Sequence, residues 1–475
     1  MRKDNCQVFD YIPNYHVSSF NHSADAGPKE DDGFCQLFIE KGRKGYCLAG
    51  ERLSEARLDQ ILKNLGTSEA SNFVPFNLCF FKMKEEVSLK DLVDFLQKSQ
   101  LLVNENQKIP TLSLKVLNSL LRSTLFRFQS KKSNDYEKIG KFDLFSITDG
   151  SFSRVDPFLQ FQVTSLAGSM NCLCAWVLAK LASIKRLSSN LNLPGKISKI
   201  LPLNVGQAAC TYGVFDSSPV GSAFFDLGFE RFFTPGQFKT AQQIYQQVRL
   251  DGFVVLSHFD TDHFLGAAFS SSQSHNIFLK SWIIPDLSWV KTPNQLVSEL
   301  SISSILLLVS LFSSGNSSIY MLSSNCNQQW VKVAENVFIQ VGLGKNKNDS
   351  GIVSYIAGKQ GLLVIPGDAK YEDWPVLPRP IKAMVVPHHG SCSLIPSSLL
   401  FDPKPSCIIY SGENHYGHPN LCSLLDLKIK GCYPIFRFPN DFFSKQTLNA
   451  YCCHNYRVAD PVSMISPSDF FVFFE

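Results

Sequence analysis

The feature that most constrains the fold of this chain is a short apolar segment, residues 253–256, that leads directly into four polar side chains. These are His258, Asp260, Asp262 and His263, in the segment LSHFDTDHFLG. The apolar run predicts a buried strand, and the small residues after the cluster predict the start of a helix. Two imidazoles and two carboxylates in the connecting loop can bind one or two divalent cations. The alternative is that they only cap the helix that follows.

Two more apolar segments end in the same kind of side chain. LLVIPGDA ends in Gly367 and Asp368, and IKAMVVPHHGS ends in His388 and His389. A Gly-Asp pair is common in ordinary turns, which is the simpler interpretation of Asp368 taken alone. Adjacent histidines at a strand end are uncommon in a purely structural turn and indicate metal binding. Because strand ends carry the chemistry in layered folds, we expect these segments to meet the first cluster.

Composition places the chain among globular proteins. It has 475 residues, 44% hydrophobic and 18% charged, a length that predicts two or three domains. A net charge of +4 over this length does not by itself indicate a nucleic-acid partner. The 14 cysteines contain no CxxC pair, which favours a reducing compartment, and we expect a cytoplasmic protein.

The apolar segments do not predict a membrane span or a signal peptide. The N-terminal residues are interrupted by Asp10, Asn14 and His16. The most apolar stretch, residues 302–312, is shorter than the roughly 20 residues needed to cross a bilayer. We predict that it forms a buried helix.

Changes in composition along the chain predict three regions. Residues 1–32 are polar and irregular, and predict a flexible segment. Residues 33–195 mix strand-like pieces at 35–40 and 76–83 with helical patterns at 89–100 and 114–128, which predicts a separate mixed α/β domain. A cluster of Ser, Asn, Pro and Gly in SSNLNLPGKISK marks the boundary, and residues 196–475 form the last domain.

The motifs of this last domain, taken in order, resemble a known family. LNVGQAAC, SAFFDLG, LSHFDTDHFLG, KNDSGIVSYI, LLVIPGDA, VVPHHGS and YSGENHYGHP are similar to the metallo-β-lactamase-fold domain at the C-terminus of ComEC-type competence proteins. The resemblance spans about residues 197–425, and the first 195 residues resemble nothing comparable. It implies an α+β chain in which a four-layer αββα sandwich, with a metal site at one edge of its sheets, follows the mixed α/β domain.

The resemblance also implies a role for each residue of the motifs. His258 and Asp260 would hold a first ion and Asp262 and His263 a second, with Asp368 shared between them. One of His388 and His389, preferably His388, would complete the second site.

The first site lacks the further histidine that many relatives have. The only histidine in that interval, His275, lies too close behind the first motif. Asp349 in KNKNDSG is placed where the chain should return to the site and could supply an oxygen instead.

Two other residues have roles beside the metal ligands. Asp226 in FFDLGF resembles the strand-end aspartate that orients the metal loop without touching the metal, although a simple turn aspartate is an equal alternative. His418 in HYGHPN would contact the scissile phosphate or protonate the leaving group; alternatively it packs in its loop against Tyr416 and Pro419.

The predicted function is hydrolysis of phosphodiester bonds. Two divalent ions, Zn²⁺ or Mn²⁺, would generate a metal-bound hydroxide, with Asp262 orienting the water, and the substrate would be DNA, RNA or a nucleotide. One alternative keeps the metals and changes the substrate to a cyclic nucleotide, a lactone or a thioester. Another makes the last domain a degenerate binding module in a multiprotein assembly, in which the N-terminal domain binds a protein partner.

Overall fold

In this computed structural model, the chain forms two compact units. Unit 1 is Met1–Ser183 with Ser288–Gly315, and unit 2 is Ile184–Leu287 with Asn316–Glu475. The structure describes residues 9–11, 33–41, 45–65, 79–83, 88–92, 125–128, 142–145, 157–203, 208–216, 222–229, 252–268, 271–272, 275–315, 318–323, 329–391, 393–410, 418–437 and 471–472. Most of the predicted flexible segment, residues 1–32, lies outside these ranges.

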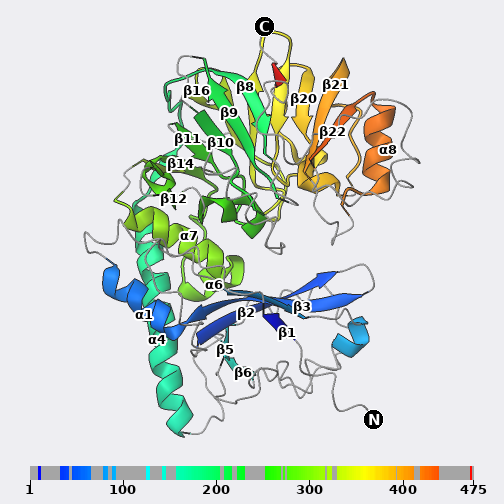
Figure 1. Cartoon of the computed structure of the whole chain (residues 1–475). Helices are drawn as coiled ribbons and strands as arrows, with labels where there is room; N and C mark the ends of the chain where they lie inside the picture. Colours follow the sequence, from blue (N-terminus) through cyan, green and yellow to red (C-terminus); the bar gives the residue numbers. More distant parts are fainter. Residues whose placement is uncertain are drawn as a thin grey trace. The chain divides into compact units, whose positions relative to one another are not determined.

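The described residues of unit 1 include a six-stranded sheet and the helices α1, α4, α6 and α7 (Figure 1). The six-stranded sheet has the order β1-β4-β3-β2-β5-β6, and its neighbouring strands are antiparallel. The strands are β1 (Phe9–Tyr11), β2 (Gly33–Lys41), β3 (Tyr46–Ser54), β4 (Cys79–Met83), β5 (Leu125–Phe128) and β6 (Phe142–Phe145). The helices are α1 (Glu55–Asn64), α4 (Pro157–Ser183), α6 (Pro293–Glu299) and α7 (Ile302–Ser313). Helix α4 contacts α1, α6 and α7.

The strands predicted at 35–40 and 76–83 are confirmed as β2 and β4. The helical pattern predicted over 114–128 is wrong at its end, because residues 125–128 form β5 between β2 and β6. The two phenylalanines of LFRF favour a strand, and pairing with β2 and β6 outweighs the local helical pattern. Residues 114–124 lie outside the described part of the chain.

The predicted buried helix at 302–312 is confirmed as α7. Ser301 caps its first turn by accepting a hydrogen bond from the Ser304 backbone N–H. The buried carboxylate of Glu51 in β3 accepts bonds from the backbone N–H and the hydroxyl of Ser303, at 2.9 and 3.1 Å. These bonds tie the segment Ser288–Gly315 to unit 1, although the sequence prediction placed it within the last domain.

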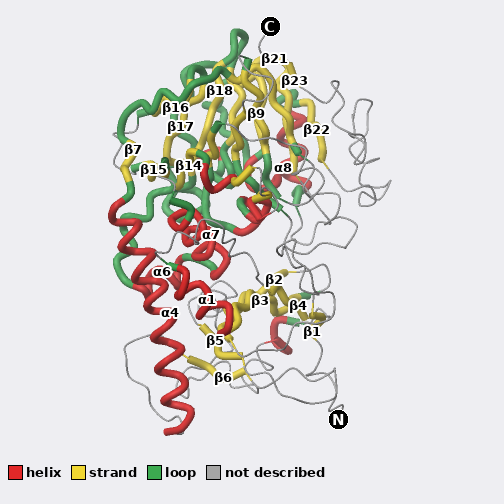
Figure 2. The backbone as a smooth tube through the Cα atoms, turned by 60° about the vertical axis from the view of Figure 1, so that its left-hand side comes forward, coloured by secondary structure: helices red, strands yellow, loops and turns green. Residues whose placement is uncertain are grey.

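Unit 2 contains two large sheets (Figure 2). The eight-stranded sheet has the order β23-β8-β9-β10-β11-β14-β15-β7 and the seven-stranded sheet runs from β16 to β22 in sequence order. The first comprises β7 (Lys185–Leu187), β8 (Ile197–Pro202), β9 (Thr211–Phe215), β10 (Ser222–Phe225), β11 (Phe253–Val255), β14 (Ser281–Ile284), β15 (Ile319–Leu322) and β23 (Phe471–Val472). The second comprises β16 (Val331–Ala334), β17 (Val337–Val341), β18 (Ile352–Ala357), β19 (Leu362–Ile365), β20 (Ile381–Val385), β21 (Phe401–Tyr410) and β22 (Tyr433–Arg437). A small hairpin joins β12 (Ser271–Ser272) to β13 (His275–Asn276).

The core of unit 2 lies between the two large sheets. One hydrophobic cluster includes Phe225 and Phe253 from the first sheet and Ile339 and Ile365 from the second. A second cluster covers the other face of the seven-stranded sheet and includes Leu424 of α8 (Leu421–Ile429). Among the described residues of unit 2, α8 is the one α-helix, so the α+β class is supported while the four-layer arrangement stays a prediction.

The predicted boundary at residue 195 falls within unit 2. Strand β7 pairs in parallel with β15, so the eight-stranded sheet begins before the polar linker-like segment. The backbone N–H groups of Leu191 and Leu193 donate to the carbonyls of Lys332 and Val333, at 2.8 and 2.7 Å. The segment is therefore attached to the second sheet, which its Ser and Asn content did not indicate.

The described helices were also compared with the requirements of a bilayer. None of them alone is long and apolar enough to cross a membrane, and α6 and α7 meet the criteria only as a pair bent by 117°.

Candidate metal centre

The predicted site residues at positions 226, 258–263, 368 and 388–389 follow four strand ends of unit 2. Strand β11 lies parallel between β10 and β14 in the first sheet, and β19 lies parallel to β20 in the second. Asp226 follows β10, and the 258–263 cluster follows β11. Asp368 follows β19, and His388 and His389 follow β20. The ends of the two sheets are joined by the Ile352 N–H, which donates to the Ser257 carbonyl at 2.8 Å.

Helix capping does not account for the cluster. The expected helix start is a pair of short 3₁₀ turns, Thr261–His263 and Leu265–Ala268. Asp260 stands at the capping position of the first turn, but its side chain makes no capping hydrogen bond. Its carboxylate is instead paired with the Lys347 ammonium.

Asp226 fixes the loop that carries residues 257–263. One carboxylate oxygen accepts from the Ser257 backbone N–H at 2.7 Å, and the other accepts from the Ser257 hydroxyl at 2.8 Å and lies 2.8 Å from His263 Nδ1. The side chain is 2% exposed and its residue has a positive φ of 57°. A buried carboxylate on one ring nitrogen fixes the orientation of the ring and directs the other nitrogen away from it.

The Asp262 half of the site consists of Asp262, His263 and His389, whose ligand atoms lie within 4.8 Å of one another. Asp262 Oδ2 is 3.1 Å from His389 Nε2 and 3.9 Å from His263 Nε2. His263 Nε2 is also 3.2 Å from Asp368 Oδ1. Both histidine side chains are buried, whereas that of Asp262 is 33% exposed. The ring nitrogens therefore face two carboxylates, one of them accessible from outside.

The Asp260 half consists of His258, Asp260 and His388, and it shares Asp368. His258 Nε2 lies 3.6 Å from Asp260 Oδ2 and 3.6 Å from Asp368 Oδ2. His388 Nε2 lies 3.7 Å from the same Asp368 oxygen. His258, His263 and Asp368 form the second set whose ligand atoms lie within 4.8 Å of one another. Asp368 thus presents Oδ1 to one half and Oδ2 to the other.

These residues fit a metal ion. His258 Nε2 and His263 Nε2 are buried and make no hydrogen bond within the described part of the chain. Tetrahedral ligands at roughly 2.0–2.1 Å from an ion are about 3.3 Å apart, close to the separations within both halves. Buried polar atoms ordinarily have partners, so unpartnered imidazole nitrogens facing carboxylates are better explained as ligands than as core side chains.

The two adjacent histidines serve different halves because of their backbone. His388 and His389 have φ values of 46° and 54°, and Gly390 follows at 79°. Left-handed conformations are costly for residues with a side chain and are concentrated at functional sites. The rings are 6.4 Å apart and inclined at 77°. The sequence prediction preferred His388 for the ion bound by Asp262 and His263, but His389 is the ring that lies against Asp262.

The loop between β17 and β18 contributes residues that the sequence analysis missed. Asp349, the predicted oxygen donor, is buried, and its carboxylate is paired with Lys370 Nζ at 3.3 Å and accepts from the Asn346 amide. Its neighbour Asn348 reaches the site instead, where its Nδ2 donates to Asp368 Oδ2 at 3.4 Å. Lys347 reaches Asp260. The polar segment KNKNDSG after a strand was the available sequence signal. It did not indicate which of its side chains contact the site.

Burial and neighbouring charges act in opposite directions on these groups. Burial disfavours the carboxylate of Asp368, but His388, His263 and His258 outweigh it and hold its pKa well below its usual range. Burial also disfavours a charged His263 ring, yet Asp368 and Asp226 raise its pKa well above the ordinary value. A cation binding here would compete with protons for the same ring nitrogens.

His418 lies next to the Asp260 half, and its ring centroid is 5.3 Å from that of His388. Burial, reinforced by the charges of His388 and His389, lowers the pKa of His418 to about 3. This direction favours an uncharged ring at neutral pH. Residues 411–417, which include the Tyr416 of the packing alternative, lie outside the described residues, as does the side chain of His275 in β13.

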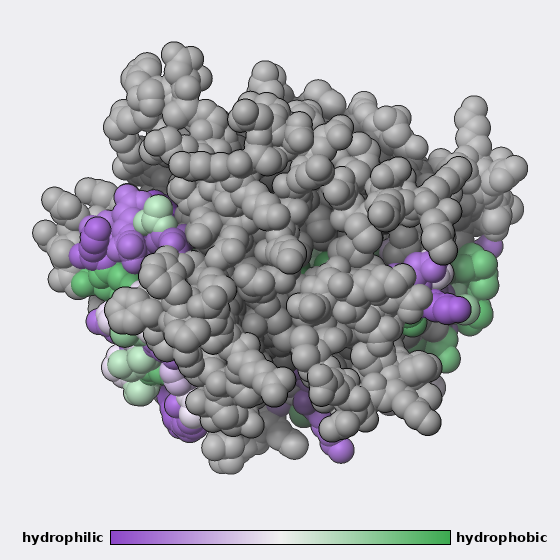
Figure 3. Space-filling model, turned by 90° about the horizontal axis from the view of Figure 1, so that it is seen from below, coloured by the Kyte–Doolittle hydropathy of each residue, from purple (hydrophilic) through white to green (hydrophobic). Residues whose placement is uncertain are grey.

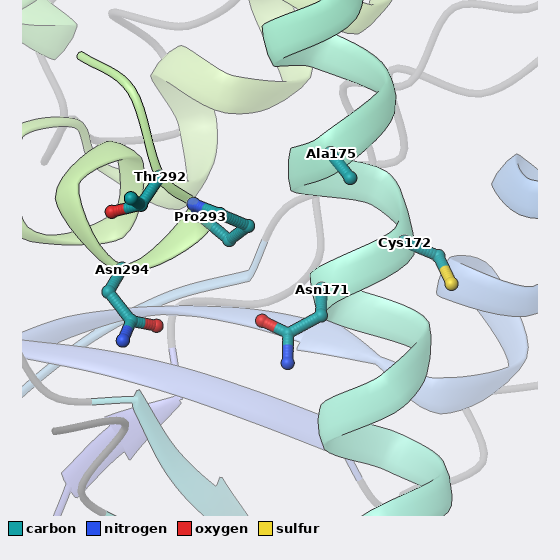
Figure 4. Close-up of a pocket in the computed structure, with 6 residues that line it drawn as sticks. All are labelled: Asn171, Cys172, Ala175, Thr292, Pro293 and Asn294. Atoms are coloured by element: carbon teal, nitrogen blue, oxygen red, sulfur yellow. The ribbon is translucent and has the colours of Figure 1, made fainter. Parts of the chain in front are cut away.

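A separate cavity lies in unit 1. Its volume is about 500 Å³, and it is lined by α4 and the start of α6, including Asn171, Cys172 and Asn294. Asn171 points toward the side of the cavity that carries Pro293 and Asn294, whereas the Cys172 side chain points away (Figure 4). The described residues visible from below include both hydrophilic and hydrophobic side chains (Figure 3). None of the predicted site residues belongs to this unit.

Comparisons with known proteins identify no family. No protein-family model matches the chain, and no curated protein matches it. Among solved structures, it is similar to Tm1679, a metal-dependent hydrolase of the β-lactamase superfamily, with 13% identity and a TM-score of 0.30 over 52% of this chain and 95% of that one. It is also similar to a variant of the CmlA β-hydroxylase, with 12% identity and a TM-score of 0.29 over 50% of this chain and 52% of that one. Scores this low carry no conclusion about the fold or activity of this chain.

Proposed function

We propose that unit 2 is a metal-dependent hydrolase that cleaves phosphodiester bonds in a nucleic acid or a nucleotide. The observation that carries this proposal is the pair of buried, unpartnered nitrogens, His258 Nε2 and His263 Nε2, facing the shared carboxylate of Asp368 at 3.6 and 3.2 Å. Mixed imidazole and carboxylate ligands suit Zn²⁺ and Mn²⁺. The order of the motifs, similar to that of ComEC-type domains, supports the phosphodiester substrate and a four-layer αββα sandwich.

Two ions would be held, one in each half. In the Asp262 half, the ligands would be Asp262, His263 and His389, with Asp368 Oδ1. In the Asp260 half, the ligands would be His258, Asp260 and His388, with Asp368 Oδ2. This assignment supplies a histidine to each half from the adjacent pair, and so removes the need for a further histidine in the first site.

The residues of the site have distinct tasks in the proposed reaction. A bound divalent cation supplies Lewis-acid chemistry: it lowers the pKa of a coordinated water toward about 7 and polarises a phosphoryl oxygen. Asp262 is 33% exposed, so its carboxylate can orient the attacking water. Asp226 keeps the His263 ring in one orientation. The uncharged ring of His418 is suited to hydrogen bonding with the substrate rather than to supplying a positive charge.

The test combines metal analysis with a substrate panel. Purified protein would be reconstituted separately with Mn²⁺ and Zn²⁺ and assayed on single-stranded DNA, duplex DNA, RNA, cyclic dinucleotides and bis(p-nitrophenyl) phosphate. We expect cleavage of at least one phosphodiester that depends on the added metal and disappears in His263→Ala. Absence of bound metal after reconstitution, or cleavage that persists in His263→Ala, would contradict the proposal. Because the panel uses purified protein, it also tests whether the activity needs a protein partner of unit 1.

A further inference from the structure

The loop between β17 and β18, which contacts the Asp260 half, is held by several internal hydrogen bonds. The side-chain oxygen of Asn346 accepts from the backbone N–H groups of Asn348 and Asp349, at 3.0 and 2.9 Å. The Asn346 carbonyl accepts from the N–H and the hydroxyl of Ser350, at 2.8 and 2.7 Å. At its ends, Gly342 N–H donates to the Gly351 carbonyl at 2.8 Å. A loop with this many internal bonds holds its outward side chains in defined positions.

Gly344 lies in the same loop and allows a close approach to Asp349. A Cβ at Gly344 would lie 2.1 Å from Asp349 Cβ, so only glycine allows the chain to pass so closely. Asp349 itself is buried against Lys370 Nζ at 3.3 Å. The buried aspartate anchors the loop from inside, which leaves Lys347 and Asn348 directed toward the site.

The Lys347 side chain crosses to Asp260, which is 87 residues away in the sequence. It contacts Asp260 Oδ1, whereas Oδ2 is the oxygen 3.6 Å from His258 Nε2. One oxygen of the carboxylate is therefore directed to the lysine and the other to the proposed ion. Lys347 is 39% exposed and Asp260 25% exposed, and exposed ion pairs of this kind add little to stability. The Lys347–Asp260 pair is therefore better explained by a role in the site than by a contribution to the stability of the fold.

An ammonium group has three N–H donors in a compact charge, and is a common ligand of phosphate in proteins. The Asp260 contact uses the donors on one side, and the Lys347 side chain is 39% exposed, which leaves its other donors accessible. We propose that Lys347 is a substrate-positioning residue: it orients Asp260 through Oδ1 and binds a phosphoryl oxygen of the anionic substrate. This inference rests on the proposed function and names the residue that selects an anionic ester over a neutral one.

The loop offers a matched control. Lys345 has the same charge, lies on the same loop and is exposed. The comparison uses Lys347→Gln, Lys347→Arg and Lys345→Gln in the full chain reconstituted with Mn²⁺. Calorimetry would measure the binding of inorganic phosphate and of Mn²⁺, and kinetics would measure KM and kcat for bis(p-nitrophenyl) phosphate and for the neutral ester p-nitrophenyl acetate.

We expect Lys347→Gln to weaken phosphate binding and raise KM for the phosphodiester by roughly tenfold, the usual scale of one charge-assisted hydrogen bond. Lys347→Arg should recover most of this loss, and Lys345→Gln should stay within about twofold of the parent protein, because both variants keep a cation at position 347. KM for the neutral ester should not change.

Two results would overturn the inference. One is an equal effect of Lys347→Gln and Lys345→Gln, which would indicate general attraction by surface charge. The other is a change in Mn²⁺ affinity with unchanged phosphate binding at saturating Mn²⁺, which would limit Lys347 to holding Asp260. If the parent protein binds phosphate through Lys347 but cleaves no phosphodiester, the proposed function fails while this inference stands. If phosphodiester cleavage is detected but Lys347→Gln leaves it unchanged, this inference fails while the proposed function stands.

Discussion

The two halves of the site use the same ligand types but are supported differently. In the Asp262 half, the His263 ring is fully buried and its Nδ1 lies 2.8 Å from the buried carboxylate of Asp226. In the Asp260 half, the carboxylate is paired with a lysine that is 39% exposed, and the His388 side chain is 35% exposed. Buried pairs are screened less by salt and water than exposed pairs. We therefore expect the Asp262 half to hold its ion tightly and the Asp260 half to exchange its ion more readily.

The largest effect is expected from His263→Ala. This ring lies between Asp226 and Asp368 and faces Asp262, so its loss removes a ligand and leaves three carboxylates close together. Metal-dependent phosphodiester cleavage should fall by a factor of about 10³ or more, the scale at which metal-assisted catalysis is lost. Mn²⁺ content, measured by mass spectrometry, should fall in parallel.

The control for His263→Ala is Asp216→Ala, which removes an exposed carboxylate paired with Lys196. Thermal unfolding of both variants separates loss of metal from loss of fold. If His263→Ala keeps its full metal content, the Asp262 half is not a metal site and the comparison between the halves fails.

The adjacent histidines provide the sharpest test of the comparison. His389→Ala should remove the tightly bound ion, because His389 Nε2 lies 3.1 Å from Asp262 Oδ2. His388→Ala should lower only the affinity of the exchangeable ion, because its nearest described carboxylate is Asp368, at 3.7 Å. Titration of metal-free protein with Mn²⁺ should show an unchanged tight site and a weakened second site in His388→Ala, and only a weak site in His389→Ala. The opposite order would restore the assignment preferred from the sequence.

The residues that gather at the site were predictable because each follows an apolar strand. The ligand atoms of His258, His263 and Asp368 lie within 4.8 Å of one another although Asp368 is far from the two histidines in the chain, as the common placement of strand ends requires. The division between His388 and His389 was not predictable. It depends on two positive φ values, which the pattern PHHGS does not encode for residues with side chains.

Long-range polar contacts were equally hidden in the sequence. The pairing of Lys347 with Asp260 joins two loops from different sheets, and no local pattern marks it. The same holds for the bonds between Glu51 and Ser303, which attach the segment Ser288–Gly315 to unit 1. The length and apolar composition of residues 302–312 predicted α7 itself, but not the sheet against which it packs.

A smaller effect is expected from Asp226→Asn, which keeps the shape of the side chain and removes its charge. An amide has only one oxygen, so it cannot accept both from the Ser257 N–H and from His263 Nδ1, as the two carboxylate oxygens do. The His263 ring therefore loses its fixed orientation. Mn²⁺ affinity of the Asp262 half should fall by about 10- to 100-fold, as for other residues that support a metal-bound histidine. Calorimetry measures this directly. Asp216→Asn, at an exposed ion pair with Lys196, is the matched control, and an equal loss there would show that the charge acts nonspecifically.

The smallest effect is expected from Asn348→Ala. Its amide donates to Asp368 Oδ2 at 3.4 Å, a long hydrogen bond on the oxygen assigned to the Asp260 half. Removing it should weaken the exchangeable ion by about two- to fivefold, the scale of a single weak hydrogen bond, and leave the tight ion unchanged. Ser350→Ala controls for loosening of the loop, because the Ser350 hydroxyl donates to the Asn346 carbonyl within that loop. Equal weakening of both ions by Asn348→Ala would mean that Asp368 moves as a whole, and that the two halves are coupled through it rather than supported independently.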